Sequence, residues 1–468
     1  MKKMTFGVIV GNRGFFPDVL AKEGRKDILD VLRKNGYGTV ALSMTDTTYG
    51  AVETFEDAKK CAELLASKAK EIDGLIVTLP NFGDERAVAE TIKRSGLAVP
   101  VLIQAEPDVA GRMTSDHRRD SFCGKISVCN NLRQAGIPFT LTASHTVKVT
   151  SDEFKADLDR FAAVCRIVRG LKNVRFGAIG TRPAAFNTVR YSEKILEYAG
   201  IAIEPVDLYE ILSRVDRLAD NDRVVKAKLN AIRKYTATEA IPAEGLLKMA
   251  KFGAVVSGWI KENQLAGTAI QCWTALERFF GIVPCAMMSM MSESLLPSAC
   301  EVDVTGLLAM YILQLAGGTP SALLDWNNNF EGDPDKCVLF HCSNLPKSFF
   351  ASERMDYQEI IAGSVGKENA YGTIVGRIKA SPATFCRTMT DDTDGVIRAY
   401  VGQGRFTDDE LDTFGGYGVM EIEHLQTLLS YICRVGFEHH VAVSMSETAD
   451  AIAEAMGNYL AWDVYRHT

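Results

Sequence analysis

The chain has 468 residues, a formal net charge of −7, and 47% hydrophobic and 24% charged residues. That length is too great for one hydrophobic core and predicts two or three domains. The ordinary composition excludes a disordered or collagen-like chain, and the acidic balance is unlike that of a nucleic-acid-binding protein. The eleven cysteines include no C-x-x-C pair, so we expect reduced, mostly buried thiols in a cytoplasmic protein.

The first third of the chain alternates short apolar runs with amphipathic segments. We predict strands at 6–11, 39–44, 74–79 and 99–105, separated by helices at 17–36, 54–72 and 87–96. Apolar strands separated by helices indicate a parallel sheet that is covered on both faces. The N-terminal apolar run is broken at Asn12 and Arg13, unlike a signal peptide, and no apolar run is long enough to predict a membrane span.

The same alternation restarts after a long predicted helix at 152–173. A strand at 174–180 opens a second α/β unit, and from about residue 333 the chain changes to β-like runs joined by turns. Such runs indicate an antiparallel barrel or sandwich. The predicted fold is therefore two doubly wound parallel-sheet α/β domains, 1–170 and 171–300, followed by a β-rich, barrel-like C-terminal domain at 301–468.

Four acidic or histidine residues stand out at the ends of apolar runs. They are Glu301, Asp325, His341 and His440, the last of which follows His439. We expect Asp325 to point out of its apolar run into a loop. Each has an ordinary explanation by itself, such as a helix cap for the acids or a hydrogen-bonded core position for the histidines. Together, two carboxylates and one or two imidazoles form a set of ligands for a divalent cation. This set suits Mn²⁺ better than Zn²⁺ of the kind that prefers thiolate ligands.

Polar and aromatic residues in or near the predicted loops are candidates for substrate binding. In doubly wound sheets, the loops after the carboxyl ends of strands form the ligand crevice. Arginines there could bind sugar hydroxyls or an anionic group, and an amide beside an aromatic ring suits a sugar. The candidates are Arg13, Arg182, Asn187, Gln271, Trp273 and Trp326.

Three features resemble the L-fucose isomerase and L-arabinose isomerase family: the spacing of Glu301 and Asp325, the strand end FHCSN at 340–344, and the terminal HHVAVS at 439–444. The layout of the whole chain is similar to that of the shorter fucose-isomerase-like proteins. The resemblance implies that Glu301, Asp325 and His440 bind Mn²⁺, or another divalent cation such as Mg²⁺ or Co²⁺, with His341 as a fourth ligand. It also implies a homo-oligomer, a trimer or hexamer, whose subunits could share an active site.

By the same resemblance, the chain is an aldose–ketose isomerase that works through a cis-enediol, with Glu301 and Asp325 as base and acid. The family's usual substrate is a 6-deoxyaldohexose or a pentose, such as L-fucose or L-arabinose. The alternative is a C6-anionic hexose such as sulfoquinovose, converted to 6-deoxy-6-sulfo-fructose, if Arg13 or Arg182 faces the sugar.

Two other classes of protein could begin with a doubly wound domain. A dehydrogenase is disfavoured because GNRGFF lacks the third glycine of G-x-G-x-x-G and no acidic residue ends the second predicted strand. A non-catalytic sugar-binding protein would share the two α/β lobes but would not need the carboxylate–histidine set. The sequence therefore favours the isomerase, whose partner is a small sugar and neither nucleic acid nor a membrane.

Overall fold

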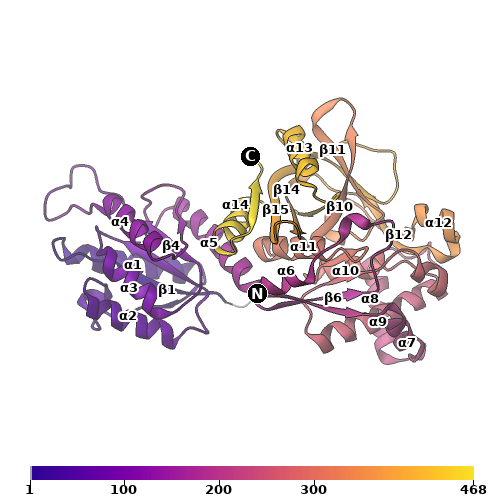
Figure 1. Ribbon diagram of the computed structural model, residues 1–468, viewed down its shortest axis with the longest axis horizontal. Coiled ribbons are helices and arrows are strands. Elements are labelled where there is room, and N and C mark those ends of the chain that lie inside the picture. The colour runs from indigo at the N-terminus through magenta and orange to yellow at the C-terminus, as the bar shows by residue number, and fades with distance from the viewer. Residues whose placement is uncertain (1–2) are drawn as a thin grey trace. The chain divides into compact units, whose positions relative to one another are not determined.

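A computed structural model describes residues 3–468 (Figure 1). They form two compact units. Unit 1 contains the described residues up to Arg169 and the segment Glu454–Ala461, and unit 2 contains Gly170–Ala453 and Trp462–Thr468. The predicted combination of parallel α/β sheets with a β-rich C-terminal part is confirmed. The predicted boundary at residue 300 lies inside unit 2, and the division into three domains stays a prediction.

Unit 1 is built on a five-stranded parallel sheet with the order β2-β1-β3-β4-β5. Its strands are β1 (Thr5–Val10), β2 (Gly38–Val40), β3 (Gly74–Leu79), β4 (Val101–Ala105) and β5 (Thr140–Leu141). Its helices are α1 (Asp18–Lys34), α2 (Phe55–Ser67), α3 (Glu85–Ser95), α4 (Ser121–Gln134) and α5 (Asp152–Gly170), with a short turn η1 (Thr48–Gly50). Every residue of β3 and β4 is buried, which explains why these segments are apolar almost throughout.

Unit 2 begins with a four-stranded parallel sheet in the order β7-β6-β8-β9. The strands are β6 (Val174–Ile179), β7 (Ile201–Val206), β8 (Thr268–Ile270) and β9 (Ser298–Cys300). The helical segments between and after them are η2 (Asn187–Val189), α6 (Glu193–Tyr198), α7 (Leu208–Asp216), α8 (Arg223–Tyr235), α9 (Ala243–Asn263), η3 (Leu276–Phe280) and α10 (Cys285–Glu293). The restart of the α/β alternation is therefore present in the structure.

The remainder of unit 2 is a nine-stranded mixed sheet. Its strands are β10 (Ser321–Phe330), β11 (Asp333–His341), β12 (Arg354–Tyr357), β13 (Tyr371–Arg377), β14 (Ser381–Asp391), β15 (Val396–Phe406), β16 (Gly416–Glu421), β17 (His440–Ser444) and β18 (Asp463–Arg466). The helical segments are α11 (Val304–Gly317), η4 (Lys347–Phe349), α12 (Glu359–Val365), η5 (Lys367–Asn369), α13 (Leu425–Val435) and α14 (Ala449–Glu454), and the segment η6 (Ala455–Tyr459) that follows belongs to unit 1. The β-rich region begins at residue 321, earlier than the predicted 333, because β10 continues from apolar SALL into polar WNNNF.

Six of these strands pair in a closed antiparallel ring. In the order β16, β11, β10, β17, β14 and β15 each strand pairs with the next, and β15 pairs again with β16. The apolar helix α11 packs against β10, β14 and β17. Because nearly all of α11 is buried, the turn that precedes it is held firmly next to these strands.

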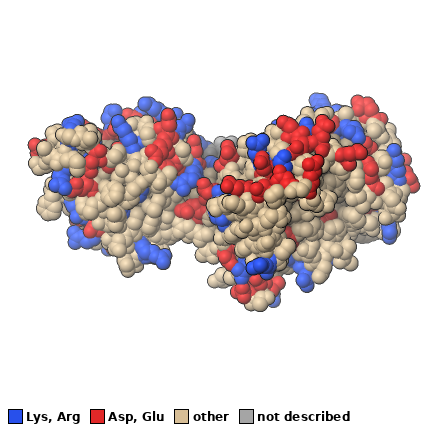
Figure 2. All heavy atoms as spheres, turned by 90° about the horizontal axis from the view of Figure 1, so that it is seen from above, with Lys and Arg blue, Asp and Glu red and all other residues tan. Residues whose placement is uncertain are grey.

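The surface carries both signs of charge. Figure 2 shows basic and acidic side chains interspersed over both units, with acidic side chains gathered along the upper edge of unit 2 in that view. Within residues 3–468, no helix combines the length and the apolar character that crossing a bilayer requires.

A close backbone contact in unit 1 gives a test of the packing. A Cβ atom at Gly124 of α4 would overlap the backbone carbonyl of Phe82, so we expect Gly124→Ala to lower the free energy of unfolding by about 1–3 kcal/mol through overpacking. Gly258 of α9 has open space around its Cα, and Gly258→Ala should instead raise that free energy by up to about 1 kcal/mol through helix propensity. Denaturant unfolding followed by circular dichroism measures both; equal effects would contradict the predicted contact.

Candidate active site

The turn between β9 and α11 presents two acids to the ring of strands. Glu301 and Val302 have φ angles of 59° and 56°, in the left-handed region that non-glycine residues rarely adopt. Such strain persists only where the surrounding structure fixes it, and it is often found at functional sites. Asp303 is the N-cap of α11 and accepts a hydrogen bond from the Gly306 amide at 2.8 Å. The turn and the cap together fix both carboxylates.

Strand register brings the other candidate ligands to the same place. Asp325 lies in the middle of β10, directly opposite His440 of β17 on one side and Phe340 of β11 on the other. His341 is the last residue of β11. Asp325 had been expected in a loop after an apolar run, and this expectation is wrong because the strand continues through it to Phe330.

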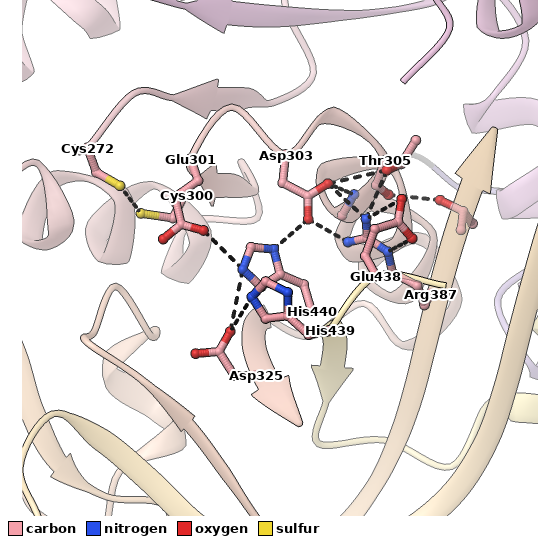
Figure 3. Close-up of polar contacts among 12 residues, drawn as sticks. Cys272, Cys300, Glu301, Asp303, Thr305, Asp325, Arg387, Glu438, His439 and His440 are labelled. Carbon is pink, nitrogen blue, oxygen red and sulfur yellow. Dashed lines mark hydrogen bonds and ion pairs between the residues drawn. The ribbon is translucent and has the colours of Figure 1, made fainter. Parts of the chain in front are cut away.

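His440 is the centre of the cluster (Figure 3). Its Nε2 atom lies 3.0 Å from Glu301 Oε2 and 3.4 Å from Asp325 Oδ1, and its Nδ1 atom lies 2.8 Å from Asp303 Oδ2. Glu301, His341 and His440 each offer a ligand atom within 4.8 Å of the others. Glu301 Oε2 is buried and, among the described residues, takes part in no hydrogen bond of acceptable geometry.

Behind His440 lies a second group of buried charges. Arg387 of β14 is fully buried; its Nη2 donates to Asp303 Oδ1 and to the Thr305 hydroxyl, both at 3.0 Å. Its Nε donates to Glu438 Oε2 at 3.1 Å. Burial alone would raise the pKa of Asp303, but Arg387 and His440 outweigh burial and hold this pKa well below its usual range. Asp303 is therefore an anion that accepts the Nδ1 proton of His440 and leaves Nε2 directed at Glu301 and Asp325.

The electrostatics of the two imidazoles differ. Burial lowers the pKa of His341, with Asp325 and Glu301 acting in the opposite direction, so His341 is a neutral potential ligand. For His440, burial also disfavours the charged form, but the neighbouring carboxylates of Asp303 and Glu301 raise the pKa to about 10. Without a metal, a proton on Nε2 would occupy the space between Glu301 and Asp325, where a cation could replace it.

Comparisons with known proteins place the chain in a family. The chain is 24% identical over 337 residues to the sulfoquinovose isomerases of Priestia aryabhattai and Priestia megaterium, a match that covers 72% of this chain and 71% of each relative. It is 25% identical to the sulfoquinovose isomerase of Alkalicoccus urumqiensis over 58% of this chain and 59% of that relative. Residues 7–172 match the fucose/sulfoquinovose isomerase N-terminal domain, and residues 339–468 match the L-fucose isomerase C-terminal domain. The chain belongs to the fucose-isomerase-like family.

The protein is thus an isomerase that interconverts aldose and ketose sugars. A solved 3-phosphoglycerate dehydrogenase from Entamoeba histolytica aligns with 67% of this chain and 94% of its own, at 13% identity and a TM-score of 0.15, and this likeness is too weak to bear on the fold. The isomerase assignment rests on the family and the curated relatives.

Two loops at the carboxyl end of the smaller parallel sheet of this fucose-isomerase-like protein hold several predicted substrate contacts. The loop after β8 contains Gln271 and Trp273, and Gln271 Oε1 accepts a hydrogen bond from the Thr181 amide in the loop after β6 at 2.9 Å. The latter loop also carries Arg182, Asn187 and Phe186. The Phe186 ring lies 5.6 Å from that of Trp273 and 6.3 Å from that of His439, so both loops border the His440 cluster.

Two other predicted contacts, Trp326 and Arg13, are engaged with neighbours of their own. Trp326 follows Asp325 in β10 and therefore points to the opposite face of the strand. Its Nε1 donates to the Tyr400 hydroxyl at 2.9 Å, and its ring packs edge-on against Phe385. Arg13 belongs to unit 1, where it pairs with Glu85 and its guanidinium lies over the Phe82 ring. The structure does not bring Trp326 to the cluster.

Asp303, Arg387 and Glu438 are not among the site residues predicted from the sequence. The available signal was Arg387 itself, a lone charge inside the strand sequence ATFCRTM. A charged residue in a buried strand must meet an opposite charge, but the sequence does not indicate that its partners lie at positions 303 and 438.

The buried ion pairs of Arg387 with Asp303 and Glu438 give a second prediction. Arg387→Met keeps the length of the side chain but removes the guanidinium that pairs with the buried carboxylates of Asp303 and Glu438, so we expect a loss of about 3–5 kcal/mol in the free energy of unfolding. Arg405 of β15 forms an exposed pair with Glu421 at 3.3 Å, and Arg405→Met should cost about 0–1 kcal/mol. Denaturant titration compares the two variants; similar losses would contradict the role of Arg387.

Proposed function

We propose that this isomerase binds a divalent cation, Mn²⁺ being the best match, and converts sulfoquinovose to 6-deoxy-6-sulfo-fructose. The observation that supports the metal most strongly is the convergence of Glu301 Oε2 and Asp325 Oδ1 on Nε2 of His440, with neutral His341 close by. Two carboxylates and two imidazoles suit Mn²⁺, and Asp303 would set the orientation of His440 as outer carboxylates do in metal sites.

The chemistry requires a proton to move between C2 and C1 and another between the two attached oxygens. A divalent cation held by Glu301, Asp325, His440 and His341 would supply positive charge that stabilises the negative charge developing on these oxygens. Glu301 and Asp325 are the carboxylates of this site that could transfer the protons. One of them removes the carbon-bound proton and returns it to the adjacent carbon of the cis-enediol, and the other moves the hydroxyl proton. Burial and the strained turn hold Glu301 in place for this role.

The anionic substrate is favoured over L-fucose or L-arabinose for two reasons. The curated relatives carry the name sulfoquinovose isomerase. In addition, Arg182 lies half-buried in the loop after β6, where its only hydrogen bond among the described contacts goes to the neighbouring Pro183 carbonyl at 3.1 Å, and no described carboxylate pairs with it. Arg13 already pairs with Glu85, so Arg182 is the better candidate for binding a sulfonate.

The metal-dependent mechanism is tested at Glu301. Glu301→Gln should lower kcat by at least about 10²-fold, because a carboxylate that transfers protons is replaced by an amide, and should also reduce the Mn²⁺ retained after dialysis. Glu331→Gln at the β10–β11 turn is the control and should keep both the rate and the metal content. Retained turnover in Glu301→Gln with intact folding would remove this residue from the mechanism.

The substrate is tested by comparing sulfoquinovose with its neutral counterpart 6-deoxy-D-glucose, with L-fucose and L-arabinose alongside. We expect the highest kcat/KM for sulfoquinovose. Arg182→Ala should lower that value by about 10- to 100-fold, as the loss of a charged hydrogen bond implies, and leave the value for 6-deoxy-D-glucose nearly unchanged. The control is Arg190→Ala, an exposed arginine of the same loop. A preference of the wild type for L-fucose or L-arabinose would overturn the proposed substrate.

A further inference from the structure

Two buried thiols lie beside the carboxylate of Glu301. Cys300 is the last residue of β9, and Cys272 follows β8 two residues beyond Ile270, the residue that pairs with Cys300. The two Sγ atoms are 2.7 Å apart, and both side chains are buried. In Figure 3 the sulfurs lie on one side of the Glu301 carboxylate and the His440 ring lies on the other. Neither thiol has a part in the proposed isomerase mechanism.

Cys272 Sγ, Cys300 Sγ and a carboxylate oxygen of Glu301 all lie within 4.8 Å of one another. Two thiolates and one carboxylate form a donor set that selects ions such as Zn²⁺ over Mn²⁺, because sulfur ligands favour soft metals. We propose that these three residues form a second metal site, specific for thiophilic divalent ions such as Zn²⁺ and Cd²⁺, which competes with the first site for Glu301.

The geometry requires only a small rearrangement. With metal–sulfur distances of 2.3 Å and tetrahedral angles, two ligating sulfurs are about 3.8 Å apart, so the thiols must separate by about 1 Å from their present positions through side-chain rotation. Each thiol releases its proton to the solvent as its sulfur binds the ion. The two thiolates and the Glu301 carboxylate then outweigh the charge of the ion, and a fourth position is left for water.

Sharing Glu301 makes the two sites compete. Two dications that shared this one carboxylate would repel each other at close range, so the binding of one ion weakens the binding of the other. A thiophilic ion therefore stops turnover, and added Mn²⁺ relieves the inhibition by competing for Glu301. This effect on turnover rests on the proposed function, whereas binding of the ion by the thiols does not.

The binding is measured directly on the full-length, reduced, metal-free protein titrated with Cd²⁺. The expected result is a thiolate-to-cadmium charge-transfer absorbance that saturates at one ion per chain, with two protons released. Cys272→Ala should weaken this binding by at least tenfold. Cys337→Ala removes a buried thiol that lies outside the group of three and should leave the binding unchanged. Binding of unchanged strength in Cys272→Ala, or an equal loss in Cys337→Ala, would overturn the site.

The consequence for activity is measured separately, as the Zn²⁺ concentration that halves each variant's own Mn²⁺-supported rate. In the wild type this concentration should rise with added Mn²⁺, and in Cys272→Ala it should be at least tenfold higher. If Cd²⁺ binds through the thiols but Zn²⁺ does not inhibit, the competition for Glu301 is wrong while the site stands. If thiol titration of the unfolded protein finds two fewer thiols than the eleven in the sequence, and Cys272→Ala abolishes the difference, the pair is a disulfide and the site is excluded.

Discussion

The buried carboxylate of Asp303 is the interaction on which the rest of the site depends. It caps α11 through the Gly306 amide, binds Arg387 of β14 and accepts the Nδ1 proton of His440 from β17. One side chain thus fixes the start of a buried helix, the position of a buried guanidinium and the orientation of the central imidazole. Each of these groups would be costly to bury alone, and together they satisfy one another.

Ring topology explains why residues far apart in the chain meet with such precision. β10 lies between β11 and β17, so Asp325 has strand neighbours on both sides, and a register shift of one residue would turn His440 away from it. The β9–α11 turn approaches the same strands because α11 packs against β10 and β17. The smaller parallel sheet therefore supplies Glu301, and the ring supplies Asp325, His341 and His440.

The fold could be predicted from the sequence where the hydrophobic pattern is local. The candidate site could be predicted only through the resemblance to the isomerase family. Apolar strands and amphipathic helices can be recognised over a few residues, so the α/β units were found. Asp325 was expected in a loop because the polar half of β10 resembles one. Trp326 was named as a sugar contact because the strand was not recognised at this point, so the alternation of successive side chains between its two faces could not be used. Asp303 could be interpreted only as a helix cap, since its partners Arg387 and Glu438 are 84 and more residues away and no local pattern connects them.

The charge balance of the site supports a cation more strongly than any single distance does. Four carboxylates lie in this group: Asp303 and Glu438 pair with the one guanidinium, that of Arg387, and Glu301 and Asp325 lie beside His440. With His440 neutral, three negative charges remain uncompensated, and an imidazolium would remove only one of them. A buried excess of that size is unfavourable in a medium of low polarity. The divalent cation of the proposed function, bound at His440 with the Nδ1 proton still held by Asp303, would reduce the excess to one charge and would supply a positive charge for the hydroxyl oxygens of a sugar.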